Sequence, residues 1–240
     1  MEPYIGCSGY YYREWKGDFY PEKLPSTQWL KYYAQHFNTI EINSSFYKFP
    51  TEKSLSRWYK DTPDDFAFTI KANKLFTHFR KMNNIATELQ QFYDVVENAL
   101  QEKTKCYLFQ FPASVKYSEA LLDAILALSQ HPVLHTIEFR DISWWRADVY
   151  TAFQQAGLIF CNISLPDFPD LFVGNASVNY LRFHGKPVLY KSGYGAAGLK
   201  FWIDKINEEP PEQLFVYFNN TWFGEAIHDA RIFARNLADR

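Results

Sequence analysis

Two short segments of this 240-residue chain place a glutamate between apolar residues. Residues 39–43 are Thr-Ile-Glu-Ile-Asn, and residues 136–140 are Thr-Ile-Glu-Phe-Arg. Because side chains alternate between the two faces of a strand, each glutamate lies on the face opposite to its apolar neighbours. Two carboxylates can carry out acid–base chemistry when one has a raised pKa and the other is ionised. Glu41 and Glu138 are therefore the predicted catalytic residues.

Polar side chains also follow the other apolar runs, and these are the predicted substrate-binding residues. Four of them are basic and suit an anionic substrate, namely Lys71, Arg140, Arg182 and His184. Three are amides expected to orient it, namely Asn43, Gln110 and Asn219. The others are Ser8, Tyr10, Tyr47, His78, Tyr194 and Asn220. An alternative stays open, in which Glu138 pairs with Arg182 and Glu41 with Lys71 only to hold the strand ends together.

Two stretches lack acidic residues and combine basic residues with aromatic rings. The first lies between Asp65 and Glu88 and contains Lys71, Lys74, Arg80 and Lys81 with Phe76 and Phe79. The second lies between Asp170 and Asp204 and contains Arg182, Lys186, Lys191 and Lys200 with Tyr180, Phe183, Tyr190 and Tyr194. This combination suits a phosphate-bearing ligand or single-stranded nucleic acid. The glycines at 193, 195 and 198 offer backbone N–H donors but match no phosphate-loop motif.

Metal and nucleophile motifs are weak in this sequence. The six histidines show no His-x-His or HExxH spacing, and no Gly-x-Ser-x-Gly elbow is present. No cofactor is predicted. A divalent metal stays open as an alternative, and it would need His78 and His184 together with Glu41 or Glu138.

The apolar runs that position these residues predict a single domain over residues 1–240. Eight strands are expected at residues 4–8, 39–43, 66–71, 106–110, 134–139, 158–163, 178–183 and 214–218. Helices are expected from Thr27 to Phe37 and at residues 52–60, 84–101, 118–128, 144–155, 198–207 and 222–238. Residues 165–175 show no helical period, so the connection between strands six and seven is expected to lack a regular helix. This alternation predicts an α/β fold, a TIM-like (β/α)8 barrel, with an open doubly wound sheet as the alternative.

Composition and charge limit the class of protein and its expected location in the cell. Aromatic residues make up 19% of the chain, enough for a large core and for lining a pocket, and the net charge of −2 argues against a protein that coats nucleic acid with its whole surface. Cys7, Cys106 and Cys161 are predicted to be buried, reduced thiols. No signal peptide or membrane span is evident, so we expect a cytoplasmic protein that does not bind membranes. The oligomeric state is left open.

Motifs along nearly the whole chain resemble one family. They include Ile5-Gly6-Cys7-Ser8-Gly9-Tyr10, residues 41–47 (Glu-Ile-Asn-Ser-Ser-Phe-Tyr), Gln110-Phe111-Pro112, Arg182-Phe183-His184-Gly185 and Tyr217-Phe218-Asn219-Asn220. The sequence resembles the YecE-like family, domain of unknown function 72. The resemblance implies a TIM-like barrel, similar to the superfamily of endonuclease IV and sugar isomerases, and no assigned reaction. Cys7 is a departure, because the family commonly has a small hydroxyl residue there.

Three functions remain as hypotheses. The first is an enzyme, a hydrolase or a lyase, that acts on a phosphorylated or otherwise anionic small molecule at the C-terminal mouth of the barrel. The second is a nucleic-acid-binding or DNA-repair-associated protein, which rests on fold analogy with endonuclease IV. The third is a non-catalytic scaffold that binds a partner.

Overall fold

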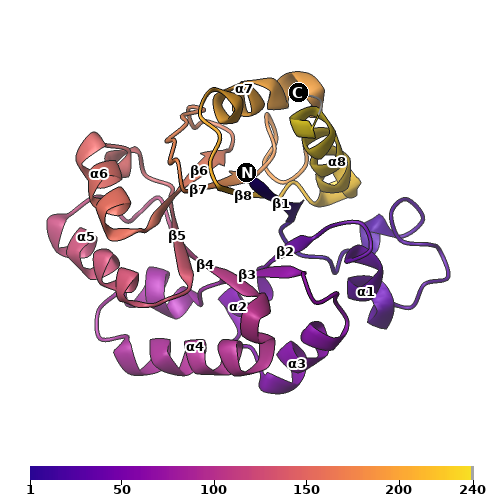
Figure 1. Ribbon diagram of the computed structural model, residues 1–240, viewed down its shortest axis with the longest axis horizontal. Coiled ribbons are helices and arrows are strands. Elements are labelled where there is room, and N and C mark those ends of the chain that lie inside the picture. The colour runs from indigo at the N-terminus through magenta and orange to yellow at the C-terminus, as the bar shows by residue number, and fades with distance from the viewer. Residues whose placement is uncertain (239–240) are drawn as a thin grey trace. The chain divides into compact units, whose positions relative to one another are not determined.

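The computed structural model describes residues 1–238 of the chain. The strands are β1 (Glu2–Cys7), β2 (Thr39–Ile42), β3 (Ala67–Lys71), β4 (Thr104–Phe111), β5 (Leu134–Phe139), β6 (Ile159–Ser164), β7 (Val178–Phe183) and β8 (Gln213–Phe218). The helices are α1 (Trp29–Tyr33), α2 (Ser44–Tyr47), α3 (Glu52–Lys60), α4 (Ala86–Leu100), α5 (Glu119–Leu126), α6 (Ala147–Ala156), α7 (Gly195–Glu208) and α8 (Glu225–Ala238) (Figure 1). A π-helix spans Leu75–Phe79, and short 3-10 turns include Ser26–Gln28 and Trp222–Gly224.

The strands form one sheet in the order β1-β8-β7-β6-β5-β4-β3-β2. A parallel bridge between Ser8 and Glu41 joins β1 to β2, the two ends of that order. Every strand is thus paired with its neighbours in the chain, and this is the strand order of a (β/α)8 barrel. The predicted TIM-like fold is confirmed. An open doubly wound sheet would need a reversal of strand order, which is not observed.

The chain divides into two compact units, which we describe separately. The terminal unit comprises residues 1–41 and 162–240, and the central unit comprises residues 42–161. The expectation of a single domain over residues 1–240 stays a prediction, and residues 239–240 lie outside the described part of the chain.

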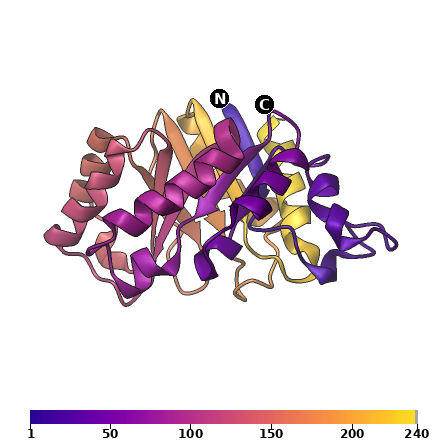
Figure 2. The ribbon, with the colours of Figure 1, turned by 90° about the horizontal axis from the view of Figure 1, so that it is seen from below.

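In the terminal unit, β8 lies between β1 and β7 (Figure 2) and pairs in parallel with both. Phe218 lies opposite Cys7 in one pairing and opposite Phe183 in the other. The Phe183 and Phe218 rings stack with centroids 4.8 Å apart. Helix α8 packs against these strands because buried residues recur every three or four positions along it, at Ile227, Ala230, Phe233 and Leu237. These contacts hold the ends of β1, β7 and β8 together.

In the central unit, β4 pairs in parallel with β3 and β5, which sets Gln110 opposite Glu138. Helix α3 begins at Thr51, whose hydroxyl accepts a hydrogen bond from the Ser54 N–H at 3.3 Å. Helices α3 and α4 lie side by side (Figure 1), and each buries apolar side chains such as Leu55 and Phe92. The polar ends of β3, β4 and β5 are therefore positioned by one packed layer.

The connection between β6 and β7 contains no helix in the described structure, as predicted. The Asn162 side chain holds it instead. Its Oδ1 accepts from the Val173 N–H at 2.6 Å, and its Nδ2 donates to the Val173 carbonyl at 3.2 Å. One amide side chain thus satisfies backbone groups that a helix would otherwise pair internally.

Most predicted elements are confirmed, with some differences in their bounds. Strands β5 and β7 have the predicted limits, whereas α1 is confined to Trp29–Tyr33 because a 3-10 turn occupies Ser26–Gln28. The single turn α2 and the π-helix were not predicted, since neither is long enough to show a hydrophobic period. The three cysteines are buried free thiols. Within residues 1–238, no helix has the length and apolar character needed to cross a membrane.

Candidate functional site

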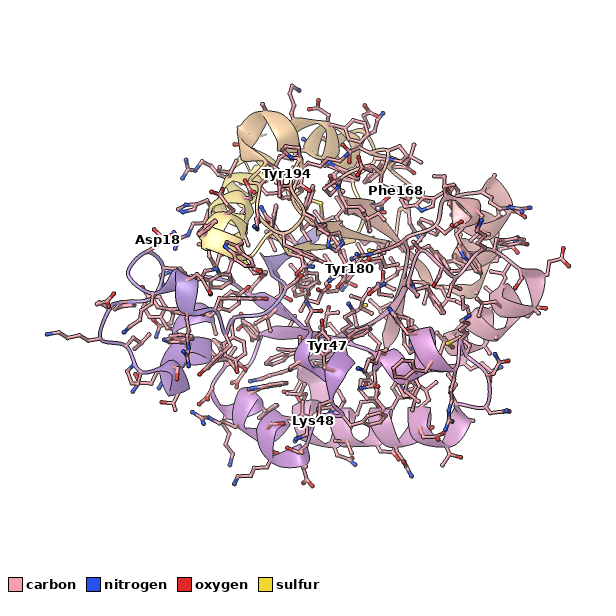
Figure 3. The ribbon with its side chains drawn as sticks, turned by 180° about the vertical axis from the view of Figure 1, so that it is seen from behind. Asp18, Tyr47, Lys48, Phe168, Tyr180 and Tyr194 are labelled. Atoms are coloured by element: carbon pink, nitrogen blue, oxygen red, sulfur yellow. The ribbon has the colours of Figure 1, made fainter. Side chains whose placement is uncertain are left out.

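The Glu41 carboxylate accepts three short hydrogen bonds within the terminal unit. Ser8 Oγ and Arg182 Nη2 each donate to Oε1 at 2.6 Å, and the Tyr180 hydroxyl donates to Oε2 at 2.6 Å. Tyr180 and Arg182 are two residues apart on β7, so their side chains leave the same face of that strand (Figure 3 labels Tyr180). Strand alternation therefore brings the side chains of Tyr180 and Arg182, together with that of Ser8, to the Glu41 carboxylate.

Burial and charge act in opposite directions on Glu41. The Glu41 and Arg182 side chains are both 0% exposed. Burial alone would raise the pKa of Glu41, but the Arg182 charge and the hydrogen bonds from Arg182, Ser8 and Tyr180 together lower it. Glu41 is thus an ionised carboxylate surrounded by protein donors. This arrangement suits a residue that orients Arg182 and Tyr180.

His184, at the end of β7, is fully buried in the terminal unit. Asn219 Nδ2 donates to His184 Nδ1 at 3.1 Å, which places the ring proton on Nε2 when the imidazole is neutral. The Tyr194 hydroxyl accepts from the Gly185 N–H at 3.0 Å and donates to the Ser164 carbonyl at 3.1 Å (Figure 3 labels Tyr194). Tyr194 therefore closes the loop that follows β7.

The first turn of α7 is capped by a buried carboxylate on α8. Asp229 accepts from the backbone N–H groups of Tyr194 and Gly195, each at 2.9 Å, and from Asn220 Nδ2 at 2.7 Å. The sequence suggested that N–H groups of this glycine-rich stretch face a ligand. The Tyr194 and Gly195 groups face Asp229 instead, because a helix N-terminus attracts any nearby anion, including one supplied by the protein.

Tyr10 also lies in the terminal unit. Its carbonyl accepts from the Tyr20 hydroxyl at 2.6 Å, and its ring contacts that of Tyr11 with centroids 6.4 Å apart. These contacts belong to the aromatic loop that follows β1. They give Tyr10 a place in the packing of that loop, and its predicted role in substrate binding stays a prediction.

In the central unit, β3 carries a lysine at its end, β4 an amide and β5 a carboxylate that is followed by an arginine. Lys71 Nζ donates to Gln110 Oε1 at 3.0 Å, and Arg140 Nε donates to Glu138 Oε1 at 2.7 Å. Glu138 is 0% exposed, whereas the Arg140 side chain is 19% exposed. The buried carboxylate is thus paired with a guanidinium that reaches solvent.

The pKa of His78 reflects the electrostatic potential near the ends of β3, β4 and β5. The residue lies on the π-helix, and its Nδ1 is 2.9 Å from Thr77 Oγ1. Burial lowers the pKa of His78, and the charges of Lys71, Arg140 and Lys74 lower it further. Three cations that disfavour protonation of the same imidazole create a positive potential there. Such a place favours an anion.

Aromatic rings lie beside Lys71 and Lys74. Lys71 Nζ lies 4.3 Å from the centroid of the Phe46 ring, and Lys74 Nζ lies 5.9 Å from that of Tyr47 and 5.5 Å from that of Phe79. Tyr47 is 72% exposed and Phe79 is 68% exposed, so both rings have faces open to solvent (Figure 3 labels Tyr47). The cations are therefore accompanied by rings available for stacking.

Asn73, which the sequence analysis did not single out, positions these rings. Its Nδ2 donates to the Ser45 carbonyl at 2.8 Å, and its Oδ1 accepts from the Leu75 N–H at 3.0 Å. Ser45 Oγ in turn donates to the Lys71 carbonyl at 2.6 Å. One buried amide thus links α2, which carries Phe46 and Tyr47, to the π-helix. The only signal in the sequence was its place two residues after the lysine that ends β3.

Asn43, which directly precedes α2 in the central unit, has a buried Oδ1 without a hydrogen-bond partner in the described chain. An unsatisfied buried acceptor is uncommon and often marks a place for water or a ligand donor. Its predicted role in orienting a substrate stays a prediction. No group of three or more His, Cys, Asp or Glu side chains within residues 1–238 is arranged to hold a metal ion.

The predicted site residues are divided between the two units. The terminal unit holds Ser8, Tyr10, Glu41, Arg182, His184, Tyr194, Asn219 and Asn220. The central unit holds Asn43, Tyr47, Lys71, His78, Gln110, Glu138 and Arg140. Within each unit most of them lie at strand ends and contact one another. The expectation that Glu41, Lys71, Glu138 and Arg182 share one cavity stays a prediction, as does the alternative pairing of Glu41 with Lys71 and of Glu138 with Arg182.

Several known proteins resemble this chain, some of them over nearly its whole length. A family model described as "Protein of unknown function DUF72" matches residues 4–240. The UPF0759 protein YunF of Bacillus subtilis (strain 168) is 27% identical over 95% of this chain and 92% of its own. The UPF0759 protein YecE of Escherichia coli (strain K12) is 36% identical over 25% of this chain and 23% of its own. The crystal structure of a DUF72 family protein from Thermotoga maritima MSB8 covers 100% of both chains with a TM-score of 0.88 and 29% identity.

Proposed function

The chain belongs to the DUF72 family, and we propose that it acts on an anionic small molecule bound at the ends of β3, β4 and β5. Lys71, Lys74 and Arg140 bind the anion in this proposal, and Glu138 supplies acid–base chemistry as in a hydrolase or a lyase. One observation carries it: Lys71, Arg140 and Lys74 all lie near enough to His78 for their charges to add to the effect of burial in lowering its pKa. A positive potential beside a carboxylate is what such a substrate requires.

The proposal treats the two glutamates differently. Glu138 lies at the edge of the positive region and is paired with Arg140, whose side chain reaches solvent. A substrate anion that engages Arg140 would weaken that pairing and bring a second negative charge near Glu138, which favours the protonated, proton-donating form of the carboxyl group. Glu41 instead receives three protein hydrogen bonds and has a lowered pKa. We therefore assign Glu41 to holding Tyr180 and Arg182 in place.

Binding of inorganic phosphate is expected to raise the pKa of His78. A bound anion offsets the charges of Lys71, Lys74 and Arg140, and so stabilises the imidazolium form. The measurement is an NMR titration of the histidine ring protons with pH, with and without phosphate at constant ionic strength. His36 lies in the terminal unit, where burial and the charge of Arg231 lower its pKa. It is the internal control and should keep its titration curve. An unchanged His78 curve at saturating phosphate would contradict the proposal.

A second candidate is binding of single-stranded nucleic acid, favoured by a patch in the terminal unit. Tyr190 is 38% exposed, Trp222 48% and Phe223 68%, and Lys191 Nζ lies 4.8 Å from the centroid of the Trp222 ring. The Trp222 N–H donates to the Tyr190 carbonyl at 3.1 Å, so the loops after β7 and β8 adjoin. Exposed rings beside a lysine are the usual means of binding bases and phosphates without sequence preference.

Affinity for an oligothymidylate is expected to fall steeply with salt if this second candidate holds. Each phosphate contacted releases counterions and contributes a slope of about −0.7 to the plot of log affinity against log salt. The measurement is fluorescence anisotropy over a salt series. Lys191→Met should reduce the slope by about one phosphate, whereas Lys23→Met, at an exposed position of the same unit, should not. Absence of binding at low salt would eliminate this candidate.

A further inference from the structure

We propose that the anion bound in the central unit carries a flat aromatic ring, as a nucleotide does, and that this ring stacks on Tyr47 and Phe79. The inference rests on the proposed function and specifies its substrate class. It is drawn from a feature that anion binding alone leaves unexplained, two large aromatic side chains that are 72% and 68% exposed beside Lys74.

The two rings come from different segments and meet at one cation. Tyr47 ends α2 and Phe79 ends the π-helix, yet Lys74 Nζ lies 5.9 Å from one ring centroid and 5.5 Å from the other. A lysine between two open rings supplies both a charge for a phosphate and faces for a base. Simple anions such as phosphate use only the charge.

Hydrogen bonds within the protein join α2, which carries Tyr47, to the π-helix, which carries Phe79. Asn73 hydrogen-bonds both to Ser45 of α2 and to Leu75 of the π-helix, at 2.8 and 3.0 Å. The His78 ring packs edge-on against Phe46, with centroids 4.9 Å apart. The backbone segments that carry Tyr47 and Phe79 are thus tied together, so a ligand need not order them, and less of the stacking free energy is lost. A π-helix is itself uncommon and is found frequently at functional sites.

The charged and aromatic parts are continuous. Lys71 Nζ lies over Phe46 at 4.3 Å, and Phe46 contacts Tyr47 with centroids 5.1 Å apart. A phosphate between Lys71 and Lys74 would therefore have an open ring beside it. Ring-bearing anions thus gain contacts on Tyr47 and Phe79 that a sugar phosphate of the same charge does not.

The test compares the affinities of three probes by isothermal titration calorimetry. They are inorganic phosphate, ribose 5-phosphate, which adds a sugar, and adenosine 5′-monophosphate, which adds a base. The nucleotide is expected to bind about tenfold more tightly than the sugar phosphate, the size of one base–aromatic stack. Tyr47→Leu and Phe79→Leu should each remove most of this advantage, so that the ratio of nucleotide affinity to ribose 5-phosphate affinity falls towards one. Phe201→Leu, at an exposed phenylalanine on α7 of the terminal unit, is the control and should change none of the three affinities.

The outcomes separate this inference from the proposed function. Equal affinity for nucleotide and sugar phosphate would contradict the inference that the ligand carries an aromatic ring, but would be compatible with the anion site. Failure of all three probes to bind would overturn both. A nucleotide advantage that survives Tyr47→Leu and Phe79→Leu would overturn the placement of the ring. An oligoadenylate that displaces the nucleotide would identify the ring's source as a strand end, and its failure to do so would identify a free nucleotide.

Discussion

Replacing Glu41 by glutamine is expected to lower the free energy of unfolding by about 3–5 kcal/mol, the usual cost of removing one member of a buried ion pair. The Arg182 guanidinium is 0% exposed and donates to Glu41 Oε1 at 2.6 Å, so water cannot replace the lost negative charge. Glutamine also brings an N–H donor to a position where three donors already converge. Urea denaturation of the variant beside the parent measures the difference.

Two further changes make this result interpretable. Asp204→Asn removes half of a surface pair with Lys200, whose side chains are 50% and 72% exposed, and should change stability by no more than about 0.5 kcal/mol. Glu138→Gln should cost no more than about 1 kcal/mol, because the Arg140 guanidinium reaches water and active-site carboxylates commonly reduce stability. If Glu138→Gln is as damaging as Glu41→Gln, Glu138 is a structural partner of Arg140 and its catalytic assignment is wrong.

The same measurement against pH checks the cause. The pKa of Glu41 in the folded protein is lower than its ordinary value of 4.5. A carboxyl with a depressed folded pKa stabilises the fold fully above its unfolded pKa, and this stabilisation is lost as pH falls through the folded pKa. The parent should therefore lose stability more steeply than Glu41→Gln as pH falls below about 4.5. Identical acid slopes would show that Glu41 is not held ionised in the folded protein.

Replacing Lys71 by methionine is expected to weaken phosphate binding by about 10–100-fold. Hydrogen bonds to charged groups contribute about 1.5–3 kcal/mol each, and 1.4 kcal/mol corresponds to a factor of ten in affinity. Methionine keeps a flexible apolar chain against the Phe46 ring, so the packing at this position is largely retained. Titration calorimetry with phosphate measures the loss.

His78 gives this variant a second readout. Lys71 is the first of the three charges that lower the pKa of His78, after burial. Its removal should raise that pKa in the protein without ligand, and should shrink the further rise on adding phosphate. Lys53→Met, at an exposed position on α3 of the same unit, should alter neither quantity. Weakened binding with an unmoved His78 pKa would mean that Lys71 acts through the fold.

Local signals in the sequence were sufficient for the strands and for the residues at their ends. Strand β5 was predicted with its observed limits because polar and apolar residues alternate from Thr136 to Phe139 and charged residues follow. Helix α2 and the π-helix escaped prediction, because a single turn has no period and a π-helix depends on what packs around it. Asn73 was missed for a related reason, since its two partners are set by tertiary structure.

The sequence by itself determined which side chains leave the polar face of each strand, because alternation along a strand is a local property of the backbone. It thereby identified Glu41 and Arg182 as strand-end charges. Only the tertiary structure decided that they pair, across 141 positions of the chain, and that Asp229 rather than a ligand receives the N–H groups of Tyr194 and Gly195. Partners so distant in sequence are chosen by strand register and helix packing, which no local pattern encodes.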